Sequence, residues 1–193
     1  VHGGFWQNLD KSYWSHLANG AVTHGYAVAM PQYTLCPEAR ISDITREISE
    51  AITLAAKRFD GPLHLTGHSA GGHLVSRMVS ATSPLAPDIR ARIHNTVSIS
   101  GVHDLRPLLT TRLNDKLQLT PEEAERESPA LLTPGANTRL FCWVGANERA
   151  EFIRQNDLLA NIWTGLGAVT GTYHEPDRHH FTVVDGLADP AHP

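Results

Sequence analysis

The stretch from Leu63 to Leu74 constrains this chain more than any other part of its sequence. Leu63 and Leu65 alternate with polar residues and predict a short strand. The pattern Gly-x-Ser-x-Gly follows over residues 67–71, and apolar residues then recur at helical spacing. A turn this tight holds its central residue, Ser69, in a strained conformation, and the flanking glycines leave room for neighbouring backbone. The sequence therefore predicts a serine raised between a strand and a helix.

Ser69 is a candidate nucleophile because this turn places its hydroxyl at the positive end of the following helix. The backbone N–H of Ala70 is free there to bind an oxyanion. The same five-residue pattern also occurs in structural turns and in phosphate-binding loops, but no Gly-Lys-Ser/Thr follows it here. A strand before the pattern and a helix after it favour the catalytic interpretation over the structural turn.

The rest of the chain alternates between predicted strands and predicted helices. Such alternation predicts an α/β fold, in which helices cover both faces of a mainly parallel sheet. We expect the strand over 26–30 to be buried, and the helix over 41–59 shows the clearest apolar stripe. Helices are predicted over 11–24, 41–59, 74–79, 152–163 and 182–188, and strands over 26–30, 63–65, 96–100, 140–144 and 168–173.

Length and composition predict one domain over residues 1–193. A chain of 193 residues, 41% of them hydrophobic, is long enough for one substantial core and short for two. Residues 104–135 interrupt the alternation with short helical pieces and four prolines, and we interpret them as a cap-like insertion over the site. Within this segment Thr120 begins a capping box with Glu123, which predicts the start of a short helix.

Charge and residue usage exclude several kinds of partner. A net charge of −4 provides no basic field for nucleic acid or an anionic membrane, and no run of 18 apolar residues is present. Two cysteines, Cys36 and Cys142, form no disulfide framework and favour a reducing, cytoplasmic location. We predict no metal, because His64 and His68 span a strand and a turn without a paired carboxylate, and no cofactor. The expected partner is a small-molecule acyl substrate, and a homodimer stays open.

A serine nucleophile needs a histidine base, and the histidine needs a carboxylate to fix its tautomer. Glu148 and His180 each follow a predicted strand, where catalytic groups of parallel sheets are found. The order Ser69, Glu148, His180 is also the order of nucleophile, acid and base in a large class of hydrolases with such sheets. These three residues are therefore the predicted catalytic triad.

Other residues of the same types compete for these roles. His179 is set aside because only one of two adjacent side chains points inward, and Phe181 favours His180. Glu151 lies three residues into a predicted helix, where solvent is its expected surrounding. The remaining competitors are His103 and His174 for the base, and Asp104 and Asp177 for the acid.

The first residues form a second motif, His-Gly-Gly-Phe-Trp over 2–6. A glycine pair after a strand lets the backbone turn its N–H groups toward a ligand, so the motif predicts an oxyanion loop. A plain glycine turn is the alternative. Phe5 and Trp6 either stack on an aryl group of the substrate or pack as part of a lid, and we count Trp6 and His68 as candidate substrate contacts.

Together these motifs resemble α/β-hydrolases of the kynurenine formamidase (arylformamidase) group, close to the hormone-sensitive-lipase-like esterases. The similarity runs through nearly all of the 193 residues, and it implies the α/β-hydrolase fold. It also implies Ser69 as nucleophile, Glu148 as acid and His180 as base, with the oxyanion hole formed by the N–H groups of Gly4, Phe5 and Ala70. The motifs that carry the resemblance are residues 2–7, 67–74, 128–129, 145–148, 151–152 and 180–181.

The resemblance implies a serine hydrolase that cleaves a small acyl group, most directly the formyl amide of an N-formylkynurenine-type substrate. A carboxylesterase or thioesterase of the same fold is the alternative within the enzymes, and a non-catalytic hydrolase-like binding protein is the alternative of another class. Two features depart from the family. Its acid is usually aspartate, whereas this chain has Glu148, and its members carry further strands before the His-Gly-Gly motif, which we expect upstream of Val1.

Overall fold

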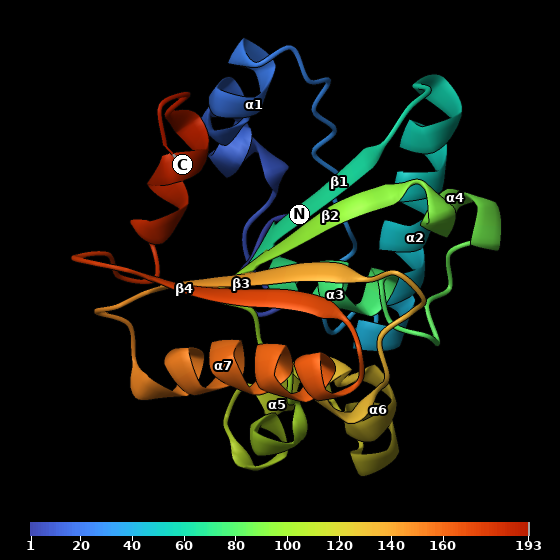
Figure 1. The fold of residues 1–193 in the computed structure, drawn as a ribbon. Helices are drawn as coiled ribbons and strands as arrows, with labels where there is room; N and C mark the ends of the chain where they lie inside the picture. The colour runs from blue at the N-terminus through green and yellow to red at the C-terminus, as the bar shows by residue number, and fades with distance from the viewer. Residues whose placement is uncertain (193) are drawn as a thin grey trace.

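A four-stranded parallel sheet forms the centre of the computed structural model, which describes residues 1–192. Its strands are β1 (Leu63–His68), β2 (Ile93–Ile99), β3 (Arg139–Gly145) and β4 (Val169–Glu175), and they lie side by side in sequence order. Because the strands are parallel, their carboxyl ends lie on the same side of the sheet (Figure 1). Side chains that directly follow the four strands are thereby brought together on that side.

Helices cover both faces of the sheet, as predicted (Figure 1). Each connection between neighbouring strands contains at least one helix. Such a crossover carries the chain back to the end of the sheet where it started, so the next strand can run parallel to the last. The helical elements are η1 (Lys11–Ala18), α1 (Asn19–Thr23), α2 (Ile41–Arg58), α3 (Ala70–Met78), α4 (Pro87–Ala91), η2 (Arg106–Thr110), α5 (Asn114–Leu117), α6 (Pro121–Glu127), η3 (Pro129–Leu131), α7 (Ala150–Gly165) and η4 (Val183–Ala188). Within residues 1–192, none of them is both long enough and apolar enough to cross a bilayer.

The two layers of core follow from the alternation of side chains along the strands. Leu140 and Cys142 on β3 lie on one face and pack with Leu159 and Trp163 of α7. Trp143, one position further along, lies on the opposite face and packs with residues of η1 and η4. Successive residues of the central strands therefore pack alternately on the two faces of the sheet, which explains why both faces of these strands are apolar.

One predicted strand is wrong. Residues 26–30 form no ladder, and Tyr26 and Val28 are 54% and 40% exposed. A strand forms only when a neighbouring strand pairs with its backbone N–H and C=O groups. Along the free edge of β1, within residues 1–192, the only backbone partner is Val1, which accepts from His68 N and donates to Thr66 O. The apolar run at 26–30 consequently has no strand beside it.

Residues 104–135 form short helices that are tied to α2. The predicted start of a short helix is confirmed, because Thr120 Oγ1 accepts the N–H of Glu123 at 3.2 Å where α6 begins, but the Glu123 side chain bonds to the start of α2 and not back to Thr120. Glu123 in turn accepts from Arg40 Nε and from the N–H of Ser42. Buried leucines of this segment, such as Leu117, join the cluster that contains the apolar stripe of α2. Its role as a cap over the site stays a prediction.

Candidate active site

Ser69 occupies the strained turn that the sequence predicts between β1 and α3. Its φ of 55° and ψ of −115° lie in a region that residues other than glycine rarely adopt. Its N–H donates to Ile99 O at 2.8 Å, which ties the turn to β2. A Cβ on Gly67 would lie 2.2 Å from Gly71 O, and a Cβ on Gly71 would lie 2.1 Å from Val1 O. Both glycines are therefore required by close approach of neighbouring backbone.

Gly71→Ala is expected to lower the free energy of unfolding by about 2–3 kcal/mol, because the added methyl overlaps the backbone oxygens of residues 1 and 2. Urea denaturation followed by circular dichroism measures this change. The matched control is Gly165→Ala at the end of α7, where a Cβ meets nothing within 4 Å and the effect should stay within about 1 kcal/mol. Equal effects of the two substitutions would contradict the crowding argument.

Glu148 and His180 form a close, largely buried pair. His180 Nδ1 lies 2.7 Å from Glu148 Oε2, and the Glu148 side chain has no exposed surface. The other carboxylate oxygen, Oε1, accepts from Ser100 Oγ at 2.5 Å and from Gly145 N at 3.0 Å. Both oxygens are thus held, and the carboxylate has one orientation relative to the imidazole.

Electrostatics favour the ionised form of this carboxyl group. Burial by itself would raise the pKa of Glu148, but hydrogen bonds from His180, Ser100 and Gly145 outweigh it and hold the pKa below its ordinary value. A carboxylate only accepts, so it binds the His180 tautomer that carries its proton on Nδ1. His180 Nε2 is left with a lone pair, which is the arrangement that a general base needs.

Four side chains of the candidate site lie in the segments that directly follow the four strands. Ser69 follows β1, Ser100 follows β2, Glu148 follows β3 and His180 follows β4. Sequence reasoning missed Ser100. The signal was a polar residue directly after a strand and before Gly101, and the structure shows that it adopts a φ of 51° while its hydroxyl reaches Glu148.

The rings of Phe152 and His68 lie nearer to the His180 ring than that of Phe181 does. The ring of Phe152 lies 4.1 Å from that of His180 between centroids, and the ring of His68 lies 4.6 Å away. Phe5 lies next to Phe152, with 6.4 Å between ring centroids. His68 Nε2 is 2.8 Å from the backbone oxygen of His180, so this ring, expected as a substrate contact, is engaged by the protein.

The His-Gly-Gly motif lies against Ser69. A Cβ on Gly3 would be 2.9 Å from Ser69 Cβ, so only glycine allows this approach. Gly4 has a φ of 113°, and its carbonyl accepts the N–H groups of Gln7 and Asn8, which closes a tight turn. Tyr33 secures the start of the loop by donating its hydroxyl to the carbonyl of residue 2 at 3.1 Å.

This turn leaves backbone donors available beside Ser69. Across residues 1–192, the N–H groups of Gly4, Phe5 and Ala70 have no hydrogen-bond acceptor. These are the three donors that the resemblance implies for an oxyanion hole. Trp6 differs from the expectation, because its ring is fully buried and lies edge-on to His73 with 5.1 Å between centroids. The geometry supports packing, rather than substrate stacking, for Trp6.

Comparison with known proteins decides the family. The family model described as "alpha/beta hydrolase fold" matches residues 1–159. This chain is an α/β-hydrolase. The predicted fold, the hydrolase class and the resemblance to the kynurenine formamidases are confirmed together, because named kynurenine formamidases are among the similar proteins.

Kynurenine formamidase of Danio rerio is 28% identical over 97% of the hydrolase and 66% of its own length, and that of Salmo salar is 27% identical over 98% and 67%. The hydrolase thus spans about two thirds of these relatives. A candidate thioesterase from Silicibacter sp. TM1040 is 48% identical, with a TM-score of 0.94 over 99% of the hydrolase and 71% of that chain. An esterase of Pyrobaculum calidifontis, 17% identical with a TM-score of 0.74 over 96% and 68%, shares the fold.

The rival residues of the hydrolase have other partners. His103 is fully buried with Nε2 3.2 Å from Ser98 Oγ, and His174 pairs with Asp157 at the surface. Glu151 binds Arg154 on the exposed side of α7, and Asp104 binds Arg106. Within the described part of the chain, no three side chains of histidine, cysteine, aspartate or glutamate gather as metal ligands.

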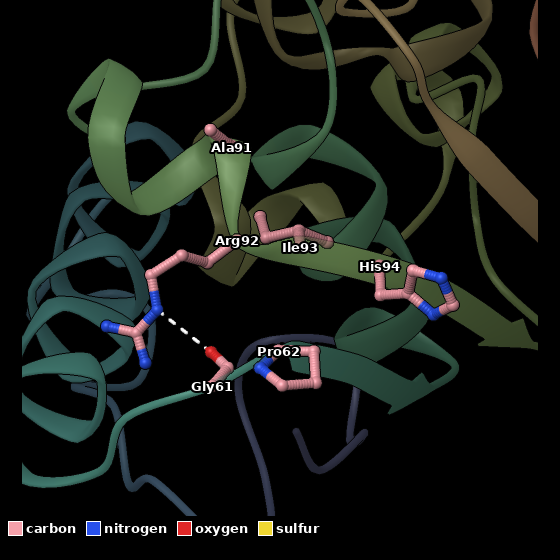
Figure 2. A pocket seen from close by; sticks show the side chains of 6 residues that line it. All are labelled: Gly61, Pro62, Ala91, Arg92, Ile93 and His94. Atoms are coloured by element: carbon pink, nitrogen blue, oxygen red, sulfur yellow. Dashed lines mark hydrogen bonds between the residues drawn. The ribbon is translucent and has the colours of Figure 1, made fainter.

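A shallow cavity of about 410 Å³ lies at the amino ends of β1 and β2, at the opposite edge of the sheet from Ser69. Figure 2 shows Arg92 reaching from this cavity toward Gly61, whose carbonyl accepts from Nε at 3.0 Å. The same guanidinium also donates to the carbonyls of Ala56 and Phe59. Arg92 therefore closes the carboxyl end of α2, and its charge is used inside the hydrolase.

Proposed function

We propose that this hydrolase cleaves the formyl group from an aryl formamide of the N-formylkynurenine type, through a triad of Ser69, His180 and Glu148. The observation that carries the proposal is the bond between His180 Nδ1 and Glu148 Oε2, in a molecule whose Ser69 occupies a nucleophile turn and whose His68 contacts His180. The names of the fish relatives favour a formamide among the acyl substrates.

In the proposed reaction, Ser69 Oγ attacks the formyl carbon while His180 Nε2 takes the hydroxyl proton. The carbonyl oxygen becomes an oxyanion and accepts from the free N–H groups of Gly4, Phe5 and Ala70. The C–N bond then breaks, and His180 returns the proton to the leaving aniline nitrogen. Water, deprotonated by His180, attacks the formyl-enzyme, and formate leaves as the hydroxyl of Ser69 is restored.

The ionised state of Glu148 stabilises the imidazolium that forms twice in this cycle. Ser100 accounts for the presence of glutamate at position 148, where the family usually has aspartate. Glutamate has one more rotatable bond than aspartate, and the two donors on Oε1 suppress that extra freedom. With the Ser100 hydroxyl 2.5 Å from its carboxylate, Glu148 can orient His180 as the shorter aspartate would.

Ser100→Ala is expected to lower kcat about tenfold with little change in KM, because a hydrogen bond to a charged group contributes about 1.5–3 kcal/mol. Ser100→Gly should lose as much, since glycine accepts the positive φ but also lacks the hydroxyl. Steady-state kinetics on a formyl anilide measure both. The control is Ser98→Ala, which removes a buried hydroxyl that faces His103 instead; a similar loss of kcat there would rule out a specific role for Ser100.

Three substrates test the proposed function: a formyl anilide, a short p-nitrophenyl ester and an acyl thioester. We expect the formyl anilide to give the highest kcat/KM. Thioester hydrolysis is the second candidate, because the candidate thioesterase from Silicibacter is 48% identical to this chain. Preference for the thioester would replace the proposed substrate while keeping the triad. Failure of a fluorophosphonate probe to label Ser69 would instead favour a non-catalytic binding protein.

A further inference from the structure

His68, the residue before the proposed nucleophile, is bonded to the residue proposed as its base. Its Nε2 lies 2.8 Å from the backbone oxygen of His180. A carbonyl oxygen only accepts, so the imidazole of His68 carries its proton on Nε2 and donates it. A single side chain thus joins the turn that holds Ser69 to the segment that holds His180.

The surroundings of His68 make it a fixed, neutral donor. Burial, and secondly the nearby His180, lower the pKa of His68 to about 3, so its ring is uncharged at neutral pH. Two rings lie near it: that of Trp14, with 6.1 Å between ring centroids, and that of His180, at 4.6 Å. A Cβ on Gly3 would be 3.2 Å from Nδ1, so the loop of residues 2–6 limits rotation of the ring as well.

The segment that carries His180 needs such a tie. Residues 176–182 lie outside any helix or strand, between β4 and η4. The carbonyl of Arg178 is held by Asn147 N at 2.9 Å, which fixes the segment to the loop of the acid. The bond from His68 fixes it at His180 itself, to the neighbour of Ser69. Reacting groups displaced by about 1 Å lose on the order of 10²-fold in rate, so the contact has a kinetic consequence.

We propose that His68 is a positioning residue, which sets the distance between the base and the nucleophile by holding the peptide carbonyl of His180. The proposal rests on the proposed function, since it presumes that Ser69 and His180 react together. His68 is not itself a general base, because its Nε2 proton is donated to a carbonyl and its Nδ1 faces Gly3. With 8% of its surface exposed, it also offers little to a substrate.

Paired substitutions of equal length test the proposal. His68→Gln keeps a side-chain N–H that can donate to the carbonyl, whereas His68→Met has similar length and no donor. We expect His68→Met to label with a fluorophosphonate about 10- to 100-fold more slowly, and to lose kcat with KM nearly unchanged. His68→Gln should recover most of that rate. His68→Phe, which keeps a ring without a donor, should behave as His68→Met does and serves if the methionine variant folds poorly.

His73 supplies the matched control. It lies on α3, is fully buried with its pKa also lowered to about 3, and its Nε2 donates to a backbone carbonyl, that of Glu127, at 2.7 Å. His73→Met should therefore lose comparable stability, measured by urea denaturation, yet label at the wild-type rate per folded molecule. Both histidines are buried and donate to a backbone carbonyl, but the bond from His73 leads to Glu127 and not to His180.

Three results would overturn the positioning role: wild-type labelling by both His68→Met and His68→Phe, no recovery in His68→Gln, or equal slowing in His73→Met. Ser69→Ala separates this failure from failure of the proposed function. If Ser69→Ala is inert while the donor-free variants of His68 react normally, the triad stands and His68 has no positioning role. If Ser69→Ala still hydrolyses substrate, the proposed function itself is wrong.

Discussion

Ser69→Ala is expected to lower kcat for formyl anilide hydrolysis by on the order of 10⁴-fold or more, since removal of a triad member leaves only the oxyanion hole and substrate binding. The fold should persist, because alanine fills the same volume apart from one oxygen and the turn is held by the bond from Ser69 N to Ile99 O. Single-turnover kinetics with purified enzyme measure the loss.

Circular dichroism and urea denaturation provide the folding control for this variant. Hydroxyl loss should also abolish labelling by a fluorophosphonate, with intact mass as the readout. A folded Ser69→Ala enzyme with activity near the wild-type level would remove serine catalysis from the account of this hydrolase.

Glu148→Gln is expected to lower kcat by on the order of 10³- to 10⁴-fold while the geometry persists. A neutral amide does not stabilise the imidazolium, and its NH₂ group can donate toward His180 Nδ1, which favours the tautomer with the proton on Nε2. That tautomer has no lone pair to offer Ser69. Steady-state kinetics and the thermal melting curve measure activity and fold in parallel.

Glu151→Gln is the matched control, three residues along the chain. Its carboxylate binds Arg154 and Gln155 at the surface of α7, where a charge pair contributes about 0–1 kcal/mol to stability and nothing to the proposed chemistry. We expect activity within twofold of the wild type. A severe loss in Glu151→Gln together with a mild one in Glu148→Gln would transfer the acid to the first turn of the helix.

Local patterns made the fold accessible from the sequence. The tight turn at 67–71 is recognised from its glycines, and the apolar stripe of α2 from its regularly spaced isoleucines. Both patterns involve only residues that are close together in the sequence. The strand expected at 26–30 failed because strand burial depends on a partner far away in the chain. Apolar residues alone did not reveal whether that partner is beside them.

The same distinction separates the site residues that were predicted from those that were missed. Glu148 and His180 could be placed because each follows a strand, and the sheet order makes those two strands neighbours. Ser100 and the role of His68 depend on where one hydroxyl and one ring nitrogen point. Tertiary packing sets the direction of a side chain such as that of Ser100, whose φ is positive, or of His68, which reaches another segment. A short stretch of sequence carries no signal for either.

Because the groups at the ends of β1 to β4 appear in that order along the polypeptide, they also leave the ribosome in that order. A nascent chain displays its serine long before residue 180 has been translated. Without an imidazole beside it, a hydroxyl is a poor nucleophile at neutral pH. In the proposed mechanism, Ser69 therefore gains its base only after residue 180 has been translated and the segment that follows β4 has reached the sheet.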